Sequence, residues 1–221
     1  MFSSNKDYIK FDDVSIAANL QVFQPYLREV EELFNLYANI INPLIIEYEV
    51  EKTEFPVEIL NEIRAIVSHL VRASVSSDDS EVHENIKKSK SHAKRAILDG
   101  YKYLCVLYDE RYHEFFERYN DTVDWIASGL QENIYALDKN RMEAVALLRV
   151  AKKSESDENN SQWLEANASE MLKNTNALCQ KYERAYNSYK DLYAQILQFD
   201  SLLSDLASQK KLFTKKFKLF N

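Results

Sequence analysis

PVEILNEIRAIVSHLVRAS (residues 56–74) has the pattern of one long helix, and EVHENIKKSKSHAKRAILDGYKYLCVL (residues 81–107) has the pattern of a second. In the first stretch, apolar residues recur at steps of three and four, which is the period of an α-helix that buries one face. Between them lies SVSSDDSE (74–81), a polar segment that predicts a turn and a cap for the second helix. Two such helices are expected to pack against each other as the centre of a helical bundle.

The composition favours helices throughout the chain. Its 221 residues include only two glycines and three prolines, and the turns of β-sheets need such residues. A hydrophobic fraction of 46% is sufficient for a core. We therefore predict an all-α fold, a mostly antiparallel helical bundle with long helices and a long C-terminal helix. The formal net charge of -7 means that any nucleic-acid or membrane site has to be a local basic patch.

We expect three segments along the chain. Residues 1–151 are predicted to form the helical bundle, interrupted at Pro25 and Pro43 because proline lacks the N–H that a helix interior needs. Residues 152–162, KKSESDENNSQ, are predicted to form a polar loop. Residues 163–221 carry apolar residues at nearly heptad spacing, which predicts a long C-terminal helix packed on the same bundle.

The sequence suggests a cytoplasmic protein. Cys105 and Cys179 lie in apolar helical contexts without CxxC spacing, which indicates free thiols in a reducing compartment more than an interhelical disulfide. The first residues carry charges and lack the apolar core of a signal peptide. No run of about 18 apolar residues predicts a membrane span.

Arg64 and His69 are the first candidates for catalytic residues. An imidazole can transfer a proton near neutral pH and a guanidinium can hold a phosphoryl oxygen, so the pair suits phosphate chemistry. Five residues turn an ideal helix by about 140° and advance it by about 7.5 Å, so these side chains are expected to flank a groove. The alternative is an exposed arginine and a surface histidine without a shared role, because so short a spacing also arises by chance.

A second candidate lies on the following helix, where polar residues recur at steps of three and four and share one face. This stripe consists of Glu84, Lys88, His92, Arg95 and Asp99. It could be a phosphate-binding wall opposite Arg64 and His69, or a solvated face of salt bridges. The side chains expected to contact an RNA backbone are His92, Arg95, Lys87, Lys88 and Lys94.

NEIRAIVSHLVRA (61–73) and HAKRAILDGYKYL (92–104) together resemble the HEPN family (higher eukaryotes and prokaryotes nucleotide-binding) of all-α proteins. The resemblance covers residues 55–107 and places a HEPN-like bundle in the segment 1–151. It implies a metal-independent endoribonuclease of bacterial defence or of a toxin–antitoxin system, without a cofactor, and a homodimer with one composite site.

By this resemblance Arg64 would hold the scissile phosphate of an RNA. His69 would activate the 2′-hydroxyl group or protonate the leaving oxygen. The family often has a polar residue after the arginine, whereas this chain has Ala65. Ala65 therefore raises the alternative of an HEPN-like protein without nuclease activity, which serves as a binding or scaffold domain.

The final residues, KKLFTKKFKLFN (210–221), alternate lysines with apolar side chains. Such a tail could lie on an anionic membrane, stack on single-stranded nucleic acid or dock on a partner protein, or its phenylalanines could pack on the bundle. The residues expected to carry this role are Lys215, Lys216, Phe217 and Phe220. The tail favours an alternative function, a non-catalytic helical bundle that mediates protein–protein or membrane-surface interaction.

Overall fold

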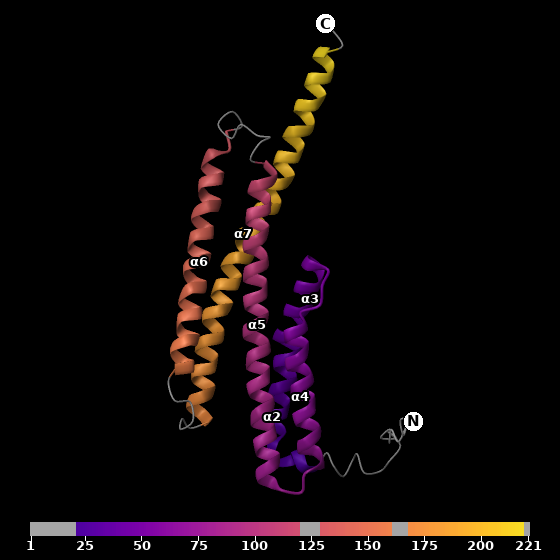
Figure 1. The fold of residues 1–221 in the computed structure, drawn as a ribbon, viewed down its shortest axis with the longest axis vertical. Coiled ribbons are helices and arrows are strands. Elements are labelled where there is room, and N and C mark those ends of the chain that lie inside the picture. The colour runs from indigo at the N-terminus through magenta and orange to yellow at the C-terminus, as the bar shows by residue number, and fades with distance from the viewer. Residues whose placement is uncertain (1–20, 120–128, 161–167, 219–221) are drawn as a thin grey trace, which may run out of the picture. The chain divides into compact units, whose positions relative to one another are not determined.

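The structure, a computed structural model, describes residues 21–119, 129–160 and 168–218 (Figure 1). No strand occurs among these residues, and the predicted all-α fold with a long C-terminal helix is confirmed. The elements in chain order are η1 (Gln21–Tyr26), α2 (Leu27–Leu36), η2 (Tyr37–Ile41), α3 (Asn42–Lys52), α4 (Val57–Val75), α5 (Asp79–Tyr119), α6 (Gln131–Asn160) and α7 (Ala168–Lys218). Within the described ranges, no helix combines the length and the apolar character that crossing a membrane requires.

Both predicted proline interruptions coincide with departures from α-helical geometry. Pro25 lies inside η1, which is a 3₁₀ helix, and regular α-helix begins only at Leu27. The π-helical segment η2 ends directly before Asn42 and Pro43. Proline supplies no N–H to the helical ladder, so the hydrogen-bond pattern has to change near it.

The prediction of a loop at 152–162 is wrong for residues 152–160, which continue helix α6, and residues 161 and 162 lie outside what the structure describes. Lys and Glu are good helix formers, so a polar composition does not by itself end a helix. Contacts also hold this part of α6 in place. Glu155 accepts hydrogen bonds from Lys102 at 2.7 Å and from Tyr182 at 2.5 Å, and Lys181 donates to Ser154 at 2.7 Å.

The chain forms two compact units, and their limits differ from the three predicted segments. The first unit contains the described residues up to Ile46 together with Pro56–Ile97. The second contains Glu47–Phe55 and the described residues from Leu98 onward. Helices α3 and α5 therefore each contribute residues to both units.

The first unit is built from η1, α2, η2, the first residues of α3, α4 and the beginning of α5. Its core includes Phe23 of η1, Ala73 of α4, and Val82 and Ile86 of α5. Helices α4 and α5 run antiparallel, as the turn between them requires. Helix α2 runs alongside α5 in the same direction, since Tyr26 donates to Asp79 at 2.8 Å and Lys90 pairs with Glu32 at 2.7 Å.

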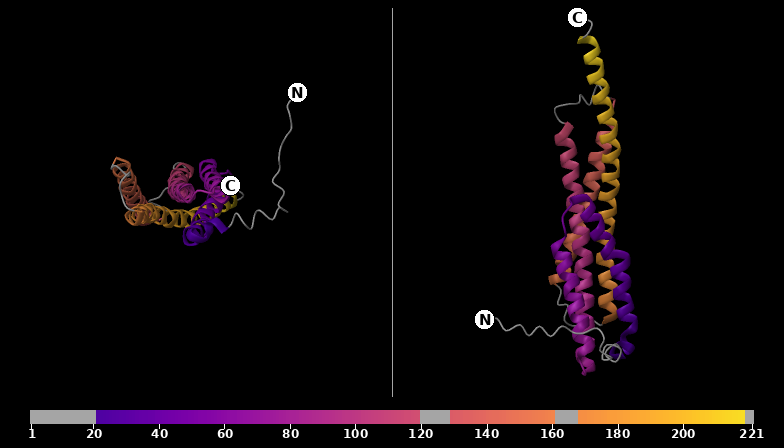
Figure 2. Two further views of the ribbon diagram at one scale, coloured as in Figure 1. Left: turned by 90° about the horizontal axis from the view of Figure 1, so that it is seen from below. Right: turned by 90° about the vertical axis from the view of Figure 1, so that its right-hand side faces the viewer.

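The second unit contains the rest of α5 with α6 and α7, and tyrosines form much of its interior. Helices α6 and α7 lie side by side and antiparallel (Figures 1 and 2), as contacts between Asn140 and Gln195 and between Glu155 and Tyr182 require. Tyr182 is fully buried. Cys105 is buried as well, and burial raises the pKa of its thiol to about 12. It forms no disulfide with Cys179.

Glu47 connects the end of α3 to α5 and α7 within this second unit. Its carboxylate accepts hydrogen bonds from Tyr108, from Tyr186 at 2.7 Å and from Lys190 at 2.8 Å. Burial raises the pKa of this carboxyl group, but the three donors outweigh burial and hold the pKa below its ordinary value of 4.5. The ionised form of Glu47 is therefore favoured by the fold.

Replacing Glu47 with glutamine should make stability less sensitive to acid. A carboxyl group with a lowered folded-state pKa contributes stability above its unfolded pKa and loses it as the pH falls through the folded one. We expect the unfolding free energy of the wild type to fall more steeply below pH 4.5 than that of Glu47→Gln. Urea denaturation between about pH 6 and pH 3 measures both slopes.

Glu49→Gln is the matched control for this measurement. It lies two residues away in α3, and no hydrogen bond or ion pair of its carboxylate is found among the described residues. Its slope should follow that of the wild type. Equal slopes for Glu47→Gln and the wild type would show that the network does not favour the ionised carboxylate.

Candidate functional site

A line of polar side chains lies between α4 and α5 in the first unit. We call it the polar seam. It consists of Glu62 and His69 of α4 and Asn85, Ser89, His92 and Arg95 of α5. Asn85 and Ser89 are 6% and 0% exposed, and within the described part of the chain they are the only buried polar residues. Both therefore lie at the contact between α4 and α5.

Helix geometry explains why these residues meet. Glu62 and His69 are seven residues apart, close to two full turns, so they share one face of α4. Asn85, Ser89 and His92 are four and three residues apart and share one face of α5. Because the helices are antiparallel, Glu62 reaches His92, the Ile66 carbonyl accepts from Ser89 at 3.3 Å, and His69 reaches Asn85.

Asn85 fixes the orientation and the tautomer of His69. The Asn85 side-chain nitrogen donates to the Glu81 carbonyl at 2.9 Å, so its Oδ1 faces His69 Nδ1, also at 2.9 Å. An amide oxygen only accepts, and therefore His69 Nδ1 carries the proton. In the neutral ring the other nitrogen, Nε2, is then an unprotonated base.

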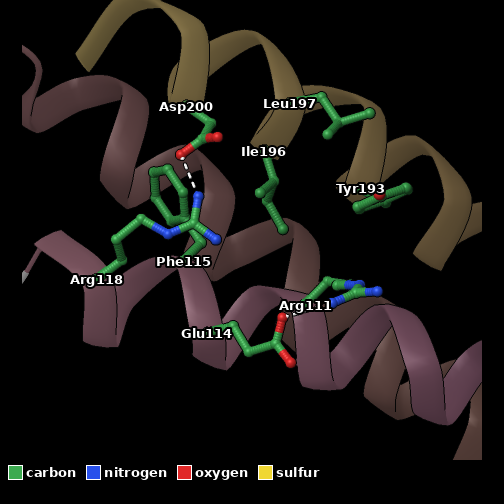
Figure 3. Close-up of a pocket in the computed structure, with 8 residues that line it drawn as sticks. All are labelled: Arg111, Glu114, Phe115, Arg118, Tyr193, Ile196, Leu197 and Asp200. Atoms are coloured by element: carbon green, nitrogen blue, oxygen red, sulfur yellow. Dashed lines mark hydrogen bonds and ion pairs between the residues drawn. The ribbon is translucent and has the colours of Figure 1, made fainter. Parts of the chain in front are cut away.

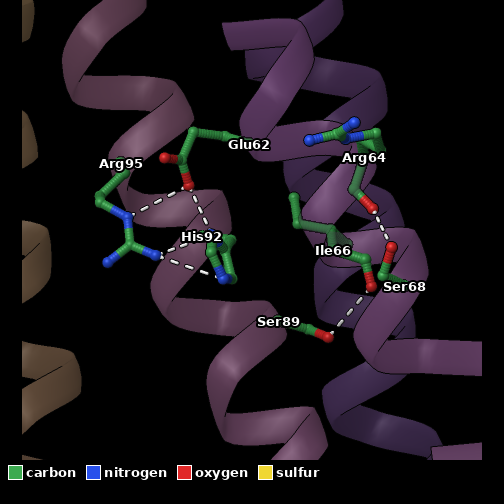
Figure 4. A network of polar contacts seen from close by, with 7 residues as sticks. All are labelled: Glu62, Arg64, Ile66, Ser68, Ser89, His92 and Arg95. Atoms are coloured by element: carbon green, nitrogen blue, oxygen red, sulfur yellow. Dashed lines mark hydrogen bonds and ion pairs between the residues drawn. The ribbon is translucent and has the colours of Figure 1, made fainter. Parts of the chain in front are cut away.

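Glu62 and Arg95 surround His92 (Figure 4). The Glu62 carboxylate lies 2.6 Å from His92 Nδ1 and accepts from Arg95 Nε at 3.1 Å. Arg95 Nη2 lies 2.7 Å from Nδ1 and 3.3 Å from Nε2 of the same ring. The Glu62 carboxylate is the acceptor of this cluster, and both the His92 ring and the Arg95 guanidinium face it. The side chains of His92 and Glu62 are about one-fifth exposed, and that of Arg95 is 49% exposed.

The two imidazole rings of the seam stack on each other. Their centroids are 5.2 Å apart and their planes are inclined by 27°. The stacking therefore places two groups that can accept or donate a proton side by side, and proton transfer to and from a reacting phosphate ester uses two such groups.

Arg64 lies outside the seam. It is exposed, and no hydrogen bond or ion pair of its guanidinium is found among the described residues. Only its backbone carbonyl is engaged, by Ser68 Oγ at 2.8 Å (Figure 4). His69 faces α5 instead, which agrees with the angle of about 140° expected for a five-residue spacing. The structure therefore brings His69, His92 and Arg95 together and leaves Arg64 on another face of α4.

The lysines assigned to RNA binding have different surroundings on α5. Lys87 is exposed, and Lys88 is exposed with Glu84 at 3.5 Å. Lys94 is half-buried and has partners of its own. The side chains of Lys215, Lys216 and Phe217 and the whole of Phe220 lie outside what the structure describes.

The sequence-based search missed Glu62, Asn85 and Ser89. A usable signal existed, because Glu62 precedes His69 by seven residues and Asn85 precedes His92 by seven. This spacing places each pair on one helix face, whereas the Arg64–His69 spacing separates its members. What the sequence lacked was the alignment of the two helices, which decides which faces meet.

A pocket of about 130 Å³ in the second unit is the other candidate (Figure 3). It lies between α5 and α7, and Phe115 and Ile196 contribute its apolar lining. Each of its two arginines is matched by an acid, Arg111 by Glu114 at 2.7 Å and Arg118 by Asp200 at 2.9 Å. The charges of the pocket are therefore balanced, because each of its two carboxylates is paired with an arginine.

Comparison with family models, with curated proteins and with solved structures finds no match to this chain. No group of three or more His, Cys, Asp or Glu side chains among the described residues could hold a metal ion. The polar seam is thus the best-formed chemical site that the described chain contains, and its function has to be inferred from its own geometry.

The tautomer of His69 is directly testable. Long-range ¹H–¹⁵N NMR of the neutral rings should show His69 protonated at Nδ1, because the Asn85 oxygen accepts that proton. Replacing Asn85 with leucine removes the acceptor and should allow the Nε2–H tautomer to appear. Finding the Nε2–H tautomer in the wild-type protein would contradict the hydrogen-bond assignment.

Proposed function

We propose that the protein is an HEPN-like, RNA-directed protein that cleaves RNA without a metal, and that the polar seam is its cleavage site. The observation that supports the proposal most is the stacked His69–His92 pair. An amide orients one ring, a carboxylate orients the other, and a half-exposed guanidinium lies beside them. These are a base, an acid and a phosphate ligand on two adjoining helices.

In the proposed reaction, His69 Nε2 takes the proton of an RNA 2′-hydroxyl group. The freed oxygen attacks the adjacent phosphorus, and the bond from phosphorus to the 5′-oxygen breaks. Protonated His92 gives its proton to that leaving oxygen. The products are a 2′,3′-cyclic phosphate and a 5′-hydroxyl end. Glu62 holds the His92 ring in position through its hydrogen bond with Nδ1.

Arg95 is the phosphate ligand that this geometry favours. Its guanidinium contacts both Glu62 and His92 and still has N–H groups open to solvent, since its side chain is 49% exposed. A guanidinium can pair with two phosphate oxygens at once. The role that the resemblance gives to Arg64 is assigned here to Arg95, because Arg64 lies on another face of α4.

Loss of either stacked histidine should abolish cleavage. We expect the rate for purified protein in EDTA to fall by about 100-fold or more in His69→Ala and in His92→Ala, which is the usual effect of removing a general acid or base. His69→Gln is a second variant, since glutamine can still donate to Asn85 but cannot take a proton. Cleavage of a labelled RNA, with circular dichroism for helix content, measures the effect.

His83→Ala is the matched control for this assay. His83 lies on α5 in the same unit, is exposed, and has Tyr26 as its ring neighbour at 5.8 Å. Its replacement should leave the rate unchanged. Arg95→Ala should reduce the cleavage rate strongly, whereas Arg64→Ala should not. The opposite result would show that Arg64, and not Arg95, binds the phosphate. Absence of cleavage by the wild type would overturn the proposed nuclease.

A non-catalytic helical module is the second candidate, and one observation favours it. Every seam side chain already has a partner within the protein, so the seam could serve only to fix α4 against α5. In that case His69→Gln would be silent. Removal of residues 210–221 would instead weaken binding to anionic vesicles or to a partner protein.

A further inference from the structure

The pocket between α5 and α7, which we call the α5–α7 pocket, lies along about two turns of each helix (Figure 3). The two helices run in the same direction beside it, because the rings of Tyr108 and Tyr193 stack and, further along both helices, Arg118 pairs with Asp200. On each helix the first and the last lining residues are seven positions apart. The pocket therefore has one end at Tyr193 and the other at Asp200.

The centre of the α5–α7 pocket is apolar, and the protein itself holds the lining in place. Phe115 of α5 and Ile196 of α7 line it and are 2% and 4% exposed. At one end the Tyr193 hydroxyl donates to Glu51 at 2.7 Å, while its ring stacks on Tyr108 with the centroids 4.8 Å apart. Because the pocket is formed in advance, binding a ligand there costs little ordering of side chains.

Arg111 brings an unused hydrogen-bond donor to this pocket. Its Nη1 donates to Glu114 at 2.7 Å, and its Nη2 donates to the Glu51 carbonyl at 2.6 Å. Its Nε is buried and is the one buried side-chain nitrogen or oxygen within the described ranges that has no hydrogen-bond partner there. A buried N–H without an acceptor is unfavourable, so a ligand that supplies an acceptor gains affinity.

The volume of the pocket limits the buried part of a ligand to one ring. The pocket measures about 130 Å³. An apolar cavity of roughly 150 Å³ holds a benzene molecule, whereas pockets for drug-sized molecules begin at roughly 300 Å³. A six-membered ring therefore fits, and the two fused rings of a purine are too large.

The polar groups around the pocket favour a neutral ring that carries both acceptors and donors. Arg111 and Arg118 are each paired with a carboxylate, so an anionic ring would add an unmatched negative charge. Arg111 Nε requires an acceptor. Glu114 is half-exposed and uses Oε2 for Arg111, so its Oε1 can accept from a donor on the ligand. Uracil and cytosine carry a carbonyl oxygen together with an N–H or amino group on one ring, whereas a phenylalanine side chain has neither.

We propose that the α5–α7 pocket binds a pyrimidine nucleobase. The ring lies against Phe115 and Ile196, and one carbonyl oxygen accepts from Arg111 Nε. The base can belong to a free nucleoside or to an RNA strand, since both present the same ring. The inference does not depend on RNA cleavage, because the α5–α7 pocket and the polar seam belong to different units of the chain.

An NMR titration with nucleosides tests the class of ligand. Uridine and cytidine should shift the backbone amide signals of residues 111–118 and 193–200. Adenosine should bind at least about 10-fold more weakly, because its fused rings exceed the pocket. Absence of shifts with both pyrimidine nucleosides, or equal affinity for adenosine, would overturn the proposal.

Two pairs of variants locate the base. Arg111→Lys keeps the positive charge but lacks the Nε donor, so it should weaken uridine binding about 10-fold, whereas Arg184→Lys, at an exposed position of α7, should not. Leu197→Trp should abolish binding by filling the pocket. Leu202→Trp is its control, since both leucines are 51% exposed on α7 and only Leu197 lines the pocket. Unchanged binding in either pocket variant, or an equal loss in its control, would contradict the assignment.

His69→Ala separates this proposal from the proposed nuclease. The variant should lose RNA cleavage and bind uridine as the wild type does, and loss of uridine binding would place the base outside the α5–α7 pocket. Penta-uridylate added to the same variant identifies the source of the base. Shifts in residues 111–118 and 193–200 with both ligands would support a base of an RNA strand, and shifts with uridine alone would support a free nucleoside.

Discussion

The contact between His69 and His92 is the interaction around which the polar side chains between α4 and α5 are arranged. Each ring belongs to a different helix, and each has a second partner from the opposite helix, Asn85 for His69 and Glu62 for His92. A buried polar group without a hydrogen bond costs roughly 1–3 kcal/mol, so sliding α4 along α5 by one turn would break several bonds at once. The same contacts that hold the helices in register therefore also bring the two imidazole rings and the Arg95 guanidinium together.

The core of the second unit is packed with tyrosines whose hydroxyl groups donate to carboxylates. Tyr108 and Tyr186 donate to Glu47, Tyr193 donates to Glu51, and Tyr182 donates to Glu155. Burial raises the pKa of Tyr186 and of Tyr193 to about 12, so these hydroxyl groups stay protonated and remain donors. The rings fill the core while their hydroxyl groups satisfy acids at its edge.

Much of the fold follows from the sequence because it depends on local patterns. The scarcity of glycine and proline, the three- and four-residue period and the short turn at 74–81 predict α4, α5 and their antiparallel arrangement. The loop expected at 152–162 was wrong for residues 152–160, because the hydrogen bonds that Glu155 receives from Lys102 and Tyr182 come from distant parts of the chain. Such long-range contacts cannot be predicted from the composition of a short segment.

The site was less predictable than the fold for the same reason. His69, His92 and Arg95 were identified from their chemistry, but their partners Glu62 and Asn85 depend on which helix faces meet. Arg64 was selected for its spacing to His69, and that spacing separates the two side chains around α4. Its exposed position on a face of α4 outside the polar seam became visible only from the structure.

The measurement that tests the central claim most directly is an NMR titration with a 2′-O-methyl oligoribonucleotide, which can bind in the seam but cannot be cleaved. The account predicts that the ring signals of His69 and His92 shift on binding, while those of His83 and His113 do not. Binding that leaves the signals of His69 and His92 unchanged would show that the polar seam is not where this protein meets RNA.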